Sequence, residues 1–426
     1  MQKMTRETPP GRHTSSPTSS MKRWALSSTV VLTLCLLSGC AHKSAMTGIA
    51  AAPGWSATTG LTHATEATAI PQSSTDTPWS RDVIIQARRI ADWRLENSAR
   101  LKDEAAGSTA CELTALINAT TYLGLADFGT VSGDARFGDA VQVGGRALGW
   151  ATSDGAGGCQ QSANQYDVIR LAWLSAAARV DGSERQERLQ PTLDRLNQTL
   201  ATLDVTGAVP CLERSSCRND TDLLSIALWA EASRLTGDPR YLAHGDDRYR
   251  TAFEPLYDTK TFLFHDQVGA EASAAGAEAS ALYNGLAYAG LARTIQAIPA
   301  DNPARLYYVA LYREMSRTIL ARQRDDGHWS AGLRHQDDGP PDMMASALFV
   351  YGLAWGLNTQ MLSFNEGETA ALSGWAALTR SLRADGVLTE ANDTGLNPRP
   401  GGRNPSPRDA VGVYLMATAQ IAERKW

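Results

Sequence analysis

The sequence predicts an all-α fold in which about twelve helices close into an (α/α)6 toroid. Three observations predict this fold. From residue 80 onward, apolar residues recur at helical spacing, as in Val83, Ala87, Ile90 and Ala91, and the alternation typical of strands is scarce. Short and long connections alternate along the chain, and every second predicted helix is apolar on nearly all sides.

The periodic stretches between Gly, Pro, Asp and Asn breakers give the individual helices. They are expected at 82–101, 110–127, 134–150, 163–180, 183–203, 219–235, 239–254, 276–297, 302–324, 342–358, 366–383 and 407–425. The eighth helix is small and hydrophobic all round, as a helix surrounded by neighbours must be, whereas the fifth is amphipathic. Even-numbered helices are therefore expected to form an inner ring and odd-numbered helices an outer ring. No convincing strand is found.

The long connections all follow odd-numbered helices. They lie at about 151–162, 204–218, 255–275, 325–341 and 384–406. In a chain of helices that runs up and down, these connections gather on one face, above the N-termini of the inner helices. Long loops on a rigid scaffold are where binding and chemistry concentrate. An open α-solenoid of about six helical pairs is the alternative architecture, and it would place the same loops along one edge.

Composition limits the classes of partner. The 426 residues contain 40 Lys+Arg and 45 Asp+Glu, a formal net charge of −5, so the chain lacks the basic footprint that nucleic-acid binding needs. Hydrophobic residues make up 43% and charged residues 20%, which suits a globular protein with a core. After the N-terminal region no apolar run reaches the roughly 18 residues of a membrane span.

The N-terminus has the pattern of an export signal. A positive segment at 21–23 precedes an apolar stretch at 24–37, and Leu-Ser-Gly-Cys at 37–40 resembles a bacterial lipobox, in which Cys40 would be lipidated. An ordinary signal peptide is the alternative. Ala41 after this cysteine favours sorting to the periplasmic face of the outer membrane.

This pattern divides the chain into three parts. Residues 1–40 form the signal and lipobox segment, and 41–79, rich in Ala, Thr, Ser, Gly and Pro, form a flexible tether. The toroid takes 80–426.

Export places four cysteines in an oxidising compartment, where disulfides are stable. Cys211 and Cys217 are close in sequence, so they are the preferred pair, with Cys111 to Cys159 as the second bridge; four cysteines allow three pairings. Zinc is disfavoured because the chain has no CxxC pair and only scattered His. We expect no metal ion and no organic cofactor.

Candidate catalytic groups lie next to the long connections. Asp220 and Asp222 open the helix at 219–235. An Asp at this position is often the N-cap, but two Asp at alternate positions cannot both be the cap, so one is free to donate or accept a proton. His265 follows an apolar triplet in the third long connection, and Trp329 in the fourth could stack on a sugar ring.

Carboxylates, His and Trp in one cleft suit carbohydrate chemistry. Motifs of the GxSxG, HExxH, Walker and GxGxxG types are absent from the sequence, so serine hydrolase, zinc protease and nucleotide-binding functions lack support.

The chain resembles glycoside hydrolase families 88 and 105, the unsaturated uronyl and rhamnogalacturonyl hydrolases, which are (α/α)6 barrels. The clearest stretches are 282–330, ASALFVYGLAWGLNTQML at 345–362 and DGVLTEANDTG at 385–395. TGDPRY at 236–241 matches the family's turn after the helix that bears its catalytic aspartate, which places Asp220 in that position. His265, in FLFHD, is similar to the family's active-site histidine, and Asp342 falls where the family usually has an acidic residue.

Two positions depart from the family pattern. Where the family commonly has paired aspartates opening the fourth helix, this chain has Ser162-Ala163-Asn164-Gln165, so an amide replaces the second carboxylate. Asn284-Gly285 are kept at the start of the eighth helix, but the family's neighbouring Arg, a partner for a uronate carboxylate, is absent.

The resemblance implies an exported, lipid-anchored glycoside hydrolase. It would act on unsaturated uronyl oligosaccharides from pectin or a similar acidic polysaccharide by hydrating the 4,5 double bond. Asp220 would be the acid and base, and His265 would orient the substrate. The residues expected to bind substrate are Asn164, Asp222, Asn284, Trp329 and Asp342.

Two alternatives stay open. One is a non-catalytic carbohydrate-binding toroid, which the amide at Asn164 and the apolar Leu282 favour. The other is a toroid polysaccharide lyase or another glycan hydrolase, in which Tyr283 and Asn284 could serve a lyase. The expected partners are an oligosaccharide and, through the lipid anchor alone, a membrane; nucleic acid is not expected.

Overall fold

The computed structural model describes residues 77–97, 111–150, 165–206, 219–266, 279–382 and 410–426, and the structural statements below concern these residues. They form twelve α-helices and four short strands. The helices are α1 (Pro78–Glu96), α3 (Cys111–Ser132), α4 (Ala135–Ala147), α5 (Gln165–Ala177), α6 (Gly182–Thr206), α7 (Asn219–Thr236), α8 (Pro239–Leu256), α10 (Ala281–Ala297), α11 (Ala304–Ala321), α12 (Met343–Asn358), α13 (Phe364–Arg380) and α14 (Val411–Ala422).

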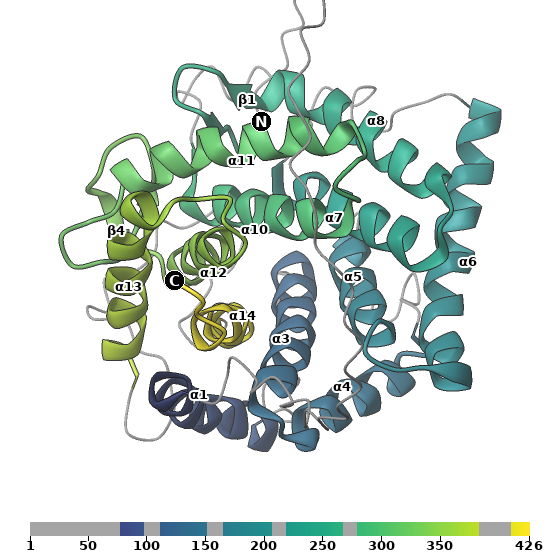
Figure 1. The fold of residues 1–426 in the computed structure, drawn as a ribbon. Coiled ribbons are helices and arrows are strands. Elements are labelled where there is room, and N and C mark those ends of the chain that lie inside the picture. The colour runs from purple at the N-terminus through teal and green to yellow at the C-terminus, as the bar shows by residue number, and fades with distance from the viewer. Residues whose placement is uncertain (1–76, 98–110, 151–164, 207–218, 267–278, 383–409) are drawn as a thin grey trace, which may run out of the picture. The chain divides into compact units, whose positions relative to one another are not determined.

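Six of these helices form a closed inner ring. Going round the ring, α3 packs on α5, α5 on α7, α7 on α10, α10 on α12, α12 on α14, and α14 again on α3 (Figure 1). The other six helices, α1, α4, α6, α8, α11 and α13, each pack on the outside of this ring. The (α/α)6 toroid predicted from the alternating connections is confirmed, and the contact between α14 and α3 excludes an open solenoid.

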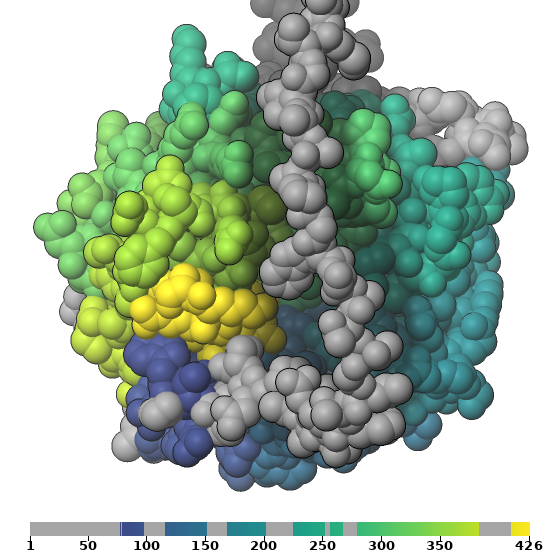
Figure 2. All heavy atoms as spheres, in the orientation of Figure 1, coloured from purple at the N-terminus to yellow at the C-terminus, as the bar shows by residue number. Residues whose placement is uncertain are grey.

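The ring closes at a contact between two helix backbones. A Cβ atom built on Gly124 of α3 would lie 2.1 Å from the carbonyl oxygen of Gly412 of α14, and one built on Gly412 would lie 2.4 Å from the carbonyl carbon of Thr120. Only glycine allows two helices to approach this closely. In the space-filling view α14 (yellow) lies directly against α1 (purple), which covers this junction from outside (Figure 2).

The apolar core fills the space between the two layers. Every residue of α12 from Met343 to Leu357 is buried, as expected for a helix with neighbours on all sides. In α11 of the outer layer, one face is buried and carries Tyr308, Leu311, Tyr312, Met315 and Ile319. None of the described helices is long and apolar enough to cross a membrane.

Two short antiparallel hairpins were not anticipated. β1 (Tyr257–Asp258) pairs with β2 (Leu263–Phe264), and β3 (Ser330–Gly332) pairs with β4 (Asp338–Pro341). Strands of two to four residues are too short to show alternation in the sequence. Both hairpins lie in connections that follow outer helices, so they belong to the long-connection end of the ring.

Several expectations concern residues outside the described ranges. The signal segment with Cys40, the tether up to residue 76, and Cys159, Cys211 and Cys217 all lie outside them. Cys111 begins α3, but its side chain is not among those described. Lipidation and both disulfides therefore stay predictions.

Candidate active site at the long-connection end of the ring

The inner helices present their N-termini at the end of the ring that carries the long connections. The aligned peptide dipoles give this end partial positive charge, which favours anionic groups. Asp220 and Asp222 lie in the first turn of α7, as predicted, although their side chains are not among those described. Asn164, one residue before α5, lies outside the described ranges.

His265 is held in a closely hydrogen-bonded segment directly after β2. Its backbone N–H donates to the carbonyl oxygen of Leu256 at 2.8 Å. The next residue, Asp266, accepts a hydrogen bond from the backbone N–H of Ser280, 2.7 Å away, at the start of α10. The position of this histidine is thereby fixed from both sides, at the end of the ring where α7 begins.

Asn284 anchors the strand that precedes His265. Its Oδ1 accepts from the backbone N–H of Phe264 at 2.8 Å, and its Nδ2 donates to the carbonyl oxygens of Phe264 at 2.9 Å and Ser280 at 3.0 Å. The Asn284 residue has no exposed surface. The predicted substrate-binding role is therefore corrected: both amide protons are used by the backbone, and Asn284 positions β2 and the histidine after it.

The second hairpin continues this hydrogen-bonded layer. The backbone N–H of Leu333 donates to the carbonyl oxygen of Ala279 at 3.0 Å, and Gly332 forms a bridge with Ser280. These bonds join the β3–β4 hairpin to the start of α10. The β1–β2 hairpin, the start of α10 and the β3–β4 hairpin are thus joined by hydrogen bonds at this end of the ring.

Asp342 is the N-cap of α12. Its Oδ1 accepts from the backbone N–H of Ala345 at 2.9 Å, and its own N–H donates to the carbonyl oxygen of Trp329 at 2.9 Å. The residue is 7% exposed. Capping of this kind stabilises a helix by satisfying an N–H group that has no intrahelical partner. This structural role stands beside the substrate contact that the sequence predicts for Asp342.

Trp329 is a core residue. It has no exposed surface, its indole Nε1–H donates to the carbonyl oxygen of Ile319 at 2.7 Å, and its ring packs on Phe349 with centroids 5.3 Å apart. A ring without exposed surface cannot stack on a sugar. The predicted role in substrate binding is therefore wrong, and the apolar neighbourhood of this residue explains its position.

Comparison with known proteins finds a match to one family model. Residues 220–420 match the family model described as Glycosyl Hydrolase Family 88. The resemblance to this family is confirmed. The matched region begins at Asp220 and includes His265, Asn284 and Asp342.

Individual relatives are similar at low identity. An unsaturated 3S-rhamnoglycuronyl hydrolase of Alteromonas sp. (strain LOR) is 26% identical over 209 residues, which are 48% of this chain and 51% of the relative. A protein of the same name from Formosa agariphila is 27% identical over 201 residues, 44% of this chain and 53% of that one. The chain thus spans about half the length of these curated relatives.

A solved structure shows the same fold. The glycosyl hydrolase family 88 protein from Bacteroides vulgatus superposes with a TM-score of 0.62 at 17% identity, covering 80% of this chain and 99% of that one. At this identity the likeness supports the toroid fold alone.

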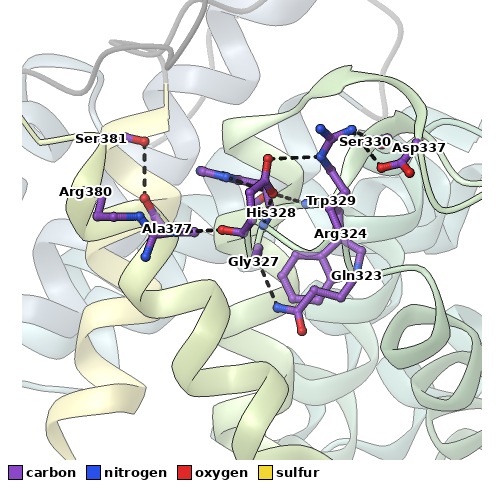
Figure 3. Close-up of polar contacts among 12 residues, drawn as sticks. Gln323, Arg324, Gly327, His328, Trp329, Ser330, Asp337, Ala377, Arg380 and Ser381 are labelled. Atoms are coloured by element: carbon purple, nitrogen blue, oxygen red, sulfur yellow. Dashed lines mark hydrogen bonds and ion pairs between the residues drawn. The ribbon is translucent and has the colours of Figure 1, made fainter.

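Within the region that matches the family 88 model, His328 lies buried between the last turn of α13 and β3 (Figure 3). Its Nδ1 is 3.4 Å from Oδ1 of Asp326, and its backbone N–H donates to the same oxygen at 2.9 Å. Burial lowers the pKa of His328, and the nearby Arg380 and Arg324 add to this effect, although Asp326 opposes it. The neutral imidazole is therefore favoured, which suits a packed residue.

The segment around His328 is held by charged side chains. Arg324 contacts Asp326 at 3.2 Å and Asp337 at 3.3 Å, and Arg380 of α13 donates to the carbonyl oxygen of Asp326 at 2.6 Å (Figure 3). Burial raises the pKa of Asp326, but the His328 backbone N–H and the Arg324 guanidinium outweigh it and hold this pKa below its usual value. The ionised form of Asp326 is therefore favoured, and this residue links the segment before β3 to α13.

The opposite end of the ring contains charged residues that the sequence analysis did not identify. Asp127 of α3 accepts from Arg179, just after α5, at 2.6 Å and from Arg293 of α10 at 2.5 Å. Burial disfavours the charged form of Arg293, but Asp127 outweighs burial and raises the pKa of this guanidinium above its usual value. In the order of the ring α3 lies opposite α10, so the Asp127–Arg293 ion pair crosses it.

These charges line a cavity of about 390 Å³ formed by the C-terminal ends of the inner helices. Burial also raises the pKa of Glu423, another residue of its lining. The cavity lies at the end away from His265. Among the described residues, no cluster of His, Cys, Asp or Glu could hold a metal ion.

Proposed function

We propose that this protein is a glycoside hydrolase that removes unsaturated uronyl residues from oligosaccharides by hydrating their 4,5 double bond. One observation carries the proposal: the family 88 match begins at Asp220, in the first turn of an inner helix of a closed toroid. His265 lies at the same end of this ring, in a segment fixed by backbone hydrogen bonds.

In this reaction Asp220 acts first as an acid and then as a base. Its carboxyl group gives a proton to C4 of the unsaturated sugar, and water adds at C5 as the carboxylate takes up a proton. The resulting hemiketal opens and releases the neighbouring sugar, so one water is consumed for each bond broken. Proton transfer by a positioned carboxyl group contributes ~10²- to 10⁴-fold in rate.

Other residues bind and orient the substrate. His265 hydrogen-bonds to the sugar, and Asn164 takes the place of a second carboxylate as a neutral hydrogen-bonding group. The positive ends of the inner helix dipoles favour the uronate anion at this end of the ring. Asp222 and Asp342 complete the set of candidate substrate contacts, and no metal or organic cofactor takes part.

The names of the relatives support the substrate class. Two curated relatives are named unsaturated 3S-rhamnoglycuronyl hydrolases. We therefore place the substrate among unsaturated uronyl oligosaccharides that a lyase releases from pectin or a similar acidic polysaccharide. The lipobox pattern that ends at Cys40 supports export and lipid anchoring at the cell envelope.

The test follows the double bond by its ultraviolet absorbance. The protein is incubated with unsaturated disaccharides from lyase digests of pectin and of other uronate polysaccharides. Absorbance should fall with the wild type and fall at least ~10²-fold more slowly with Asp220→Asn. The exposed Lys260 on the β1–β2 turn gives a control, since Lys260→Ala should retain activity. Unchanged absorbance with every digest, or full activity in Asp220→Asn, would contradict the proposal.

One observation favours the non-catalytic alternative. Asn164, an amide, comes directly before α5, where the family commonly has an aspartate. In that case the protein would bind the disaccharides, measured by calorimetry, while their absorbance stays constant.

A further inference from the structure

A basic groove lies on the outside of the ring. It has a volume of about 650 Å³ and lies between α11, the turn that joins α12 to α13, and the last two residues of the chain. This volume is within the ~300–1,000 Å³ that small-molecule sites occupy. The α12–α13 connection is a short one, so this turn belongs to the end of the ring opposite the long connections.

The groove has an excess of positive charge. Arg313 and Arg317 of α11 and Lys425 line it together with one acidic side chain, that of Glu366. Among the described residues none of the three cations forms an ion pair within 4 Å; Arg313 donates to the carbonyl oxygen of Met361 at 3.2 Å. Glu366 Oε2 accepts from the hydroxyl of Ser363 at 2.6 Å. Hydrogen bonds from Ser363 lower the pKa of Glu366, and the nearby charges of Arg313 and Arg317 add to this effect.

The two arginines repel each other. Arg313 and Arg317 are four residues apart on one helix, and like charges at this spacing destabilise a helix. Both side chains are exposed. An anion bound between them would relieve this repulsion, and a guanidinium group suits a carboxylate because it can donate two parallel hydrogen bonds.

The groove also offers apolar surface beside the charges. Phe364 is 50% exposed at the start of α13, and Leu320, Met361 and Trp426 contribute to the lining. A pyranose ring has apolar C–H faces that pack on such side chains, and its carboxylate substituent pairs with the cations. This combination of aromatic and cationic side chains fits an acidic sugar better than a neutral sugar or a phosphate alone.

We propose that this groove is a second binding site, for a uronate-containing stretch of an acidic polysaccharide. It would hold the polymer on the outer surface while the cleavage site at the other end of the ring acts on free oligosaccharides. Only the choice of uronate as the acid rests on the proposed function. The charge of the groove and its apolar lining do not depend on it.

The test compares charge-matched variants. Retardation in native gels containing polygalacturonate is measured for the wild type, for Arg317→Ala/Lys425→Ala, and for Arg185→Ala/Arg195→Ala, which removes two positive charges from α6. The groove variant should lose at least ~tenfold in affinity, and the α6 variant should bind like the wild type. The difference should shrink as salt is raised, because salt screens exposed charges.

Further measurements separate the possible outcomes. The groove variant should cleave the unsaturated disaccharide at the wild-type rate, and Asp220→Asn should bind polygalacturonate normally even though it does not cleave. Equal binding by the groove and α6 variants would overturn the proposal. It would also be overturned if the groove variant lost binding only to vesicles of phosphatidylglycerol, which would identify a membrane surface as the ligand. Absence of cleavage by the wild type would count against the proposed function and leave the groove result intact.

Discussion

Gly124→Ala tests the closure of the ring at its tightest point. The new Cβ would lie 2.1 Å from the carbonyl oxygen of Gly412, whereas ordinary contacts begin at 3.4 Å, so α3 and α14 must separate by more than 1 Å. Overpacking of this kind costs ~1–3 kcal/mol. A backbone atom cannot rotate away as a side chain can, so we expect the upper part of this range.

Gly138→Ala in α4 is the matched control. It makes the same change within a helix, but nothing lies within 4 Å of the new Cβ. Alanine should therefore stabilise the helix there by ~0.5–1 kcal/mol. The free energies of unfolding of the two variants should differ by about 2–4 kcal/mol, or by ~3–6 °C in Tm for a domain of this size. Thermal melts of the purified variants measure this, and a Gly124→Ala variant as stable as Gly138→Ala would refute the close backbone contact as the closure of the ring.

Three further predictions concern buried polar groups. Asn284→Ala should lower the free energy of unfolding by ~2–5 kcal/mol in denaturant titrations, because it removes two buried hydrogen bonds with the backbone of Phe264; an unchanged midpoint would contradict the positioning role. In the wild type, the free energy of unfolding should fall as pH falls below about 6.5, because burial lowers the pKa of His328 in the folded protein and the unfolded chain binds the proton first. This pH dependence should be weaker in His328→Gln, and identical pH profiles for the two proteins would contradict the prediction. Asp127→Ala should lower the free energy of unfolding, derived from thermal melts, by ~3–5 kcal/mol because it leaves Arg293 without its counter-ion. The double variant Asp127→Leu/Arg293→Met should recover much of this loss.

The helices and their order could be predicted from the sequence because their signals are local. The helix expected at 134–150 is α4, with Asp134 as its N-cap and Gly133 in the left-handed region with φ 64° just before it. Such caps and turns depend on neighbouring residues alone. The alternation of short and long connections then determined which helices are inner.

The polar contacts of the site could not be predicted in this way because they join distant residues. Asn284 bonds to Phe264, 20 residues away, and this pairing exists only because β1 and β2 fold back on α10. The sequence resemblance identified Asn284 as important, but it could not separate a positioning role from contact with substrate. Trp329 was misjudged for a similar reason, since the helices that enclose it come from other parts of the chain.

The ion pair between Asp127 and Arg293 links two helices that lie opposite each other in the order of the ring. The two side chains meet at the end of the ring formed by the C-termini of the inner helices. This end is therefore tied across its width by charge as well as by apolar packing, and drawing α3 away from α10 there would separate a buried guanidinium from its counter-ion.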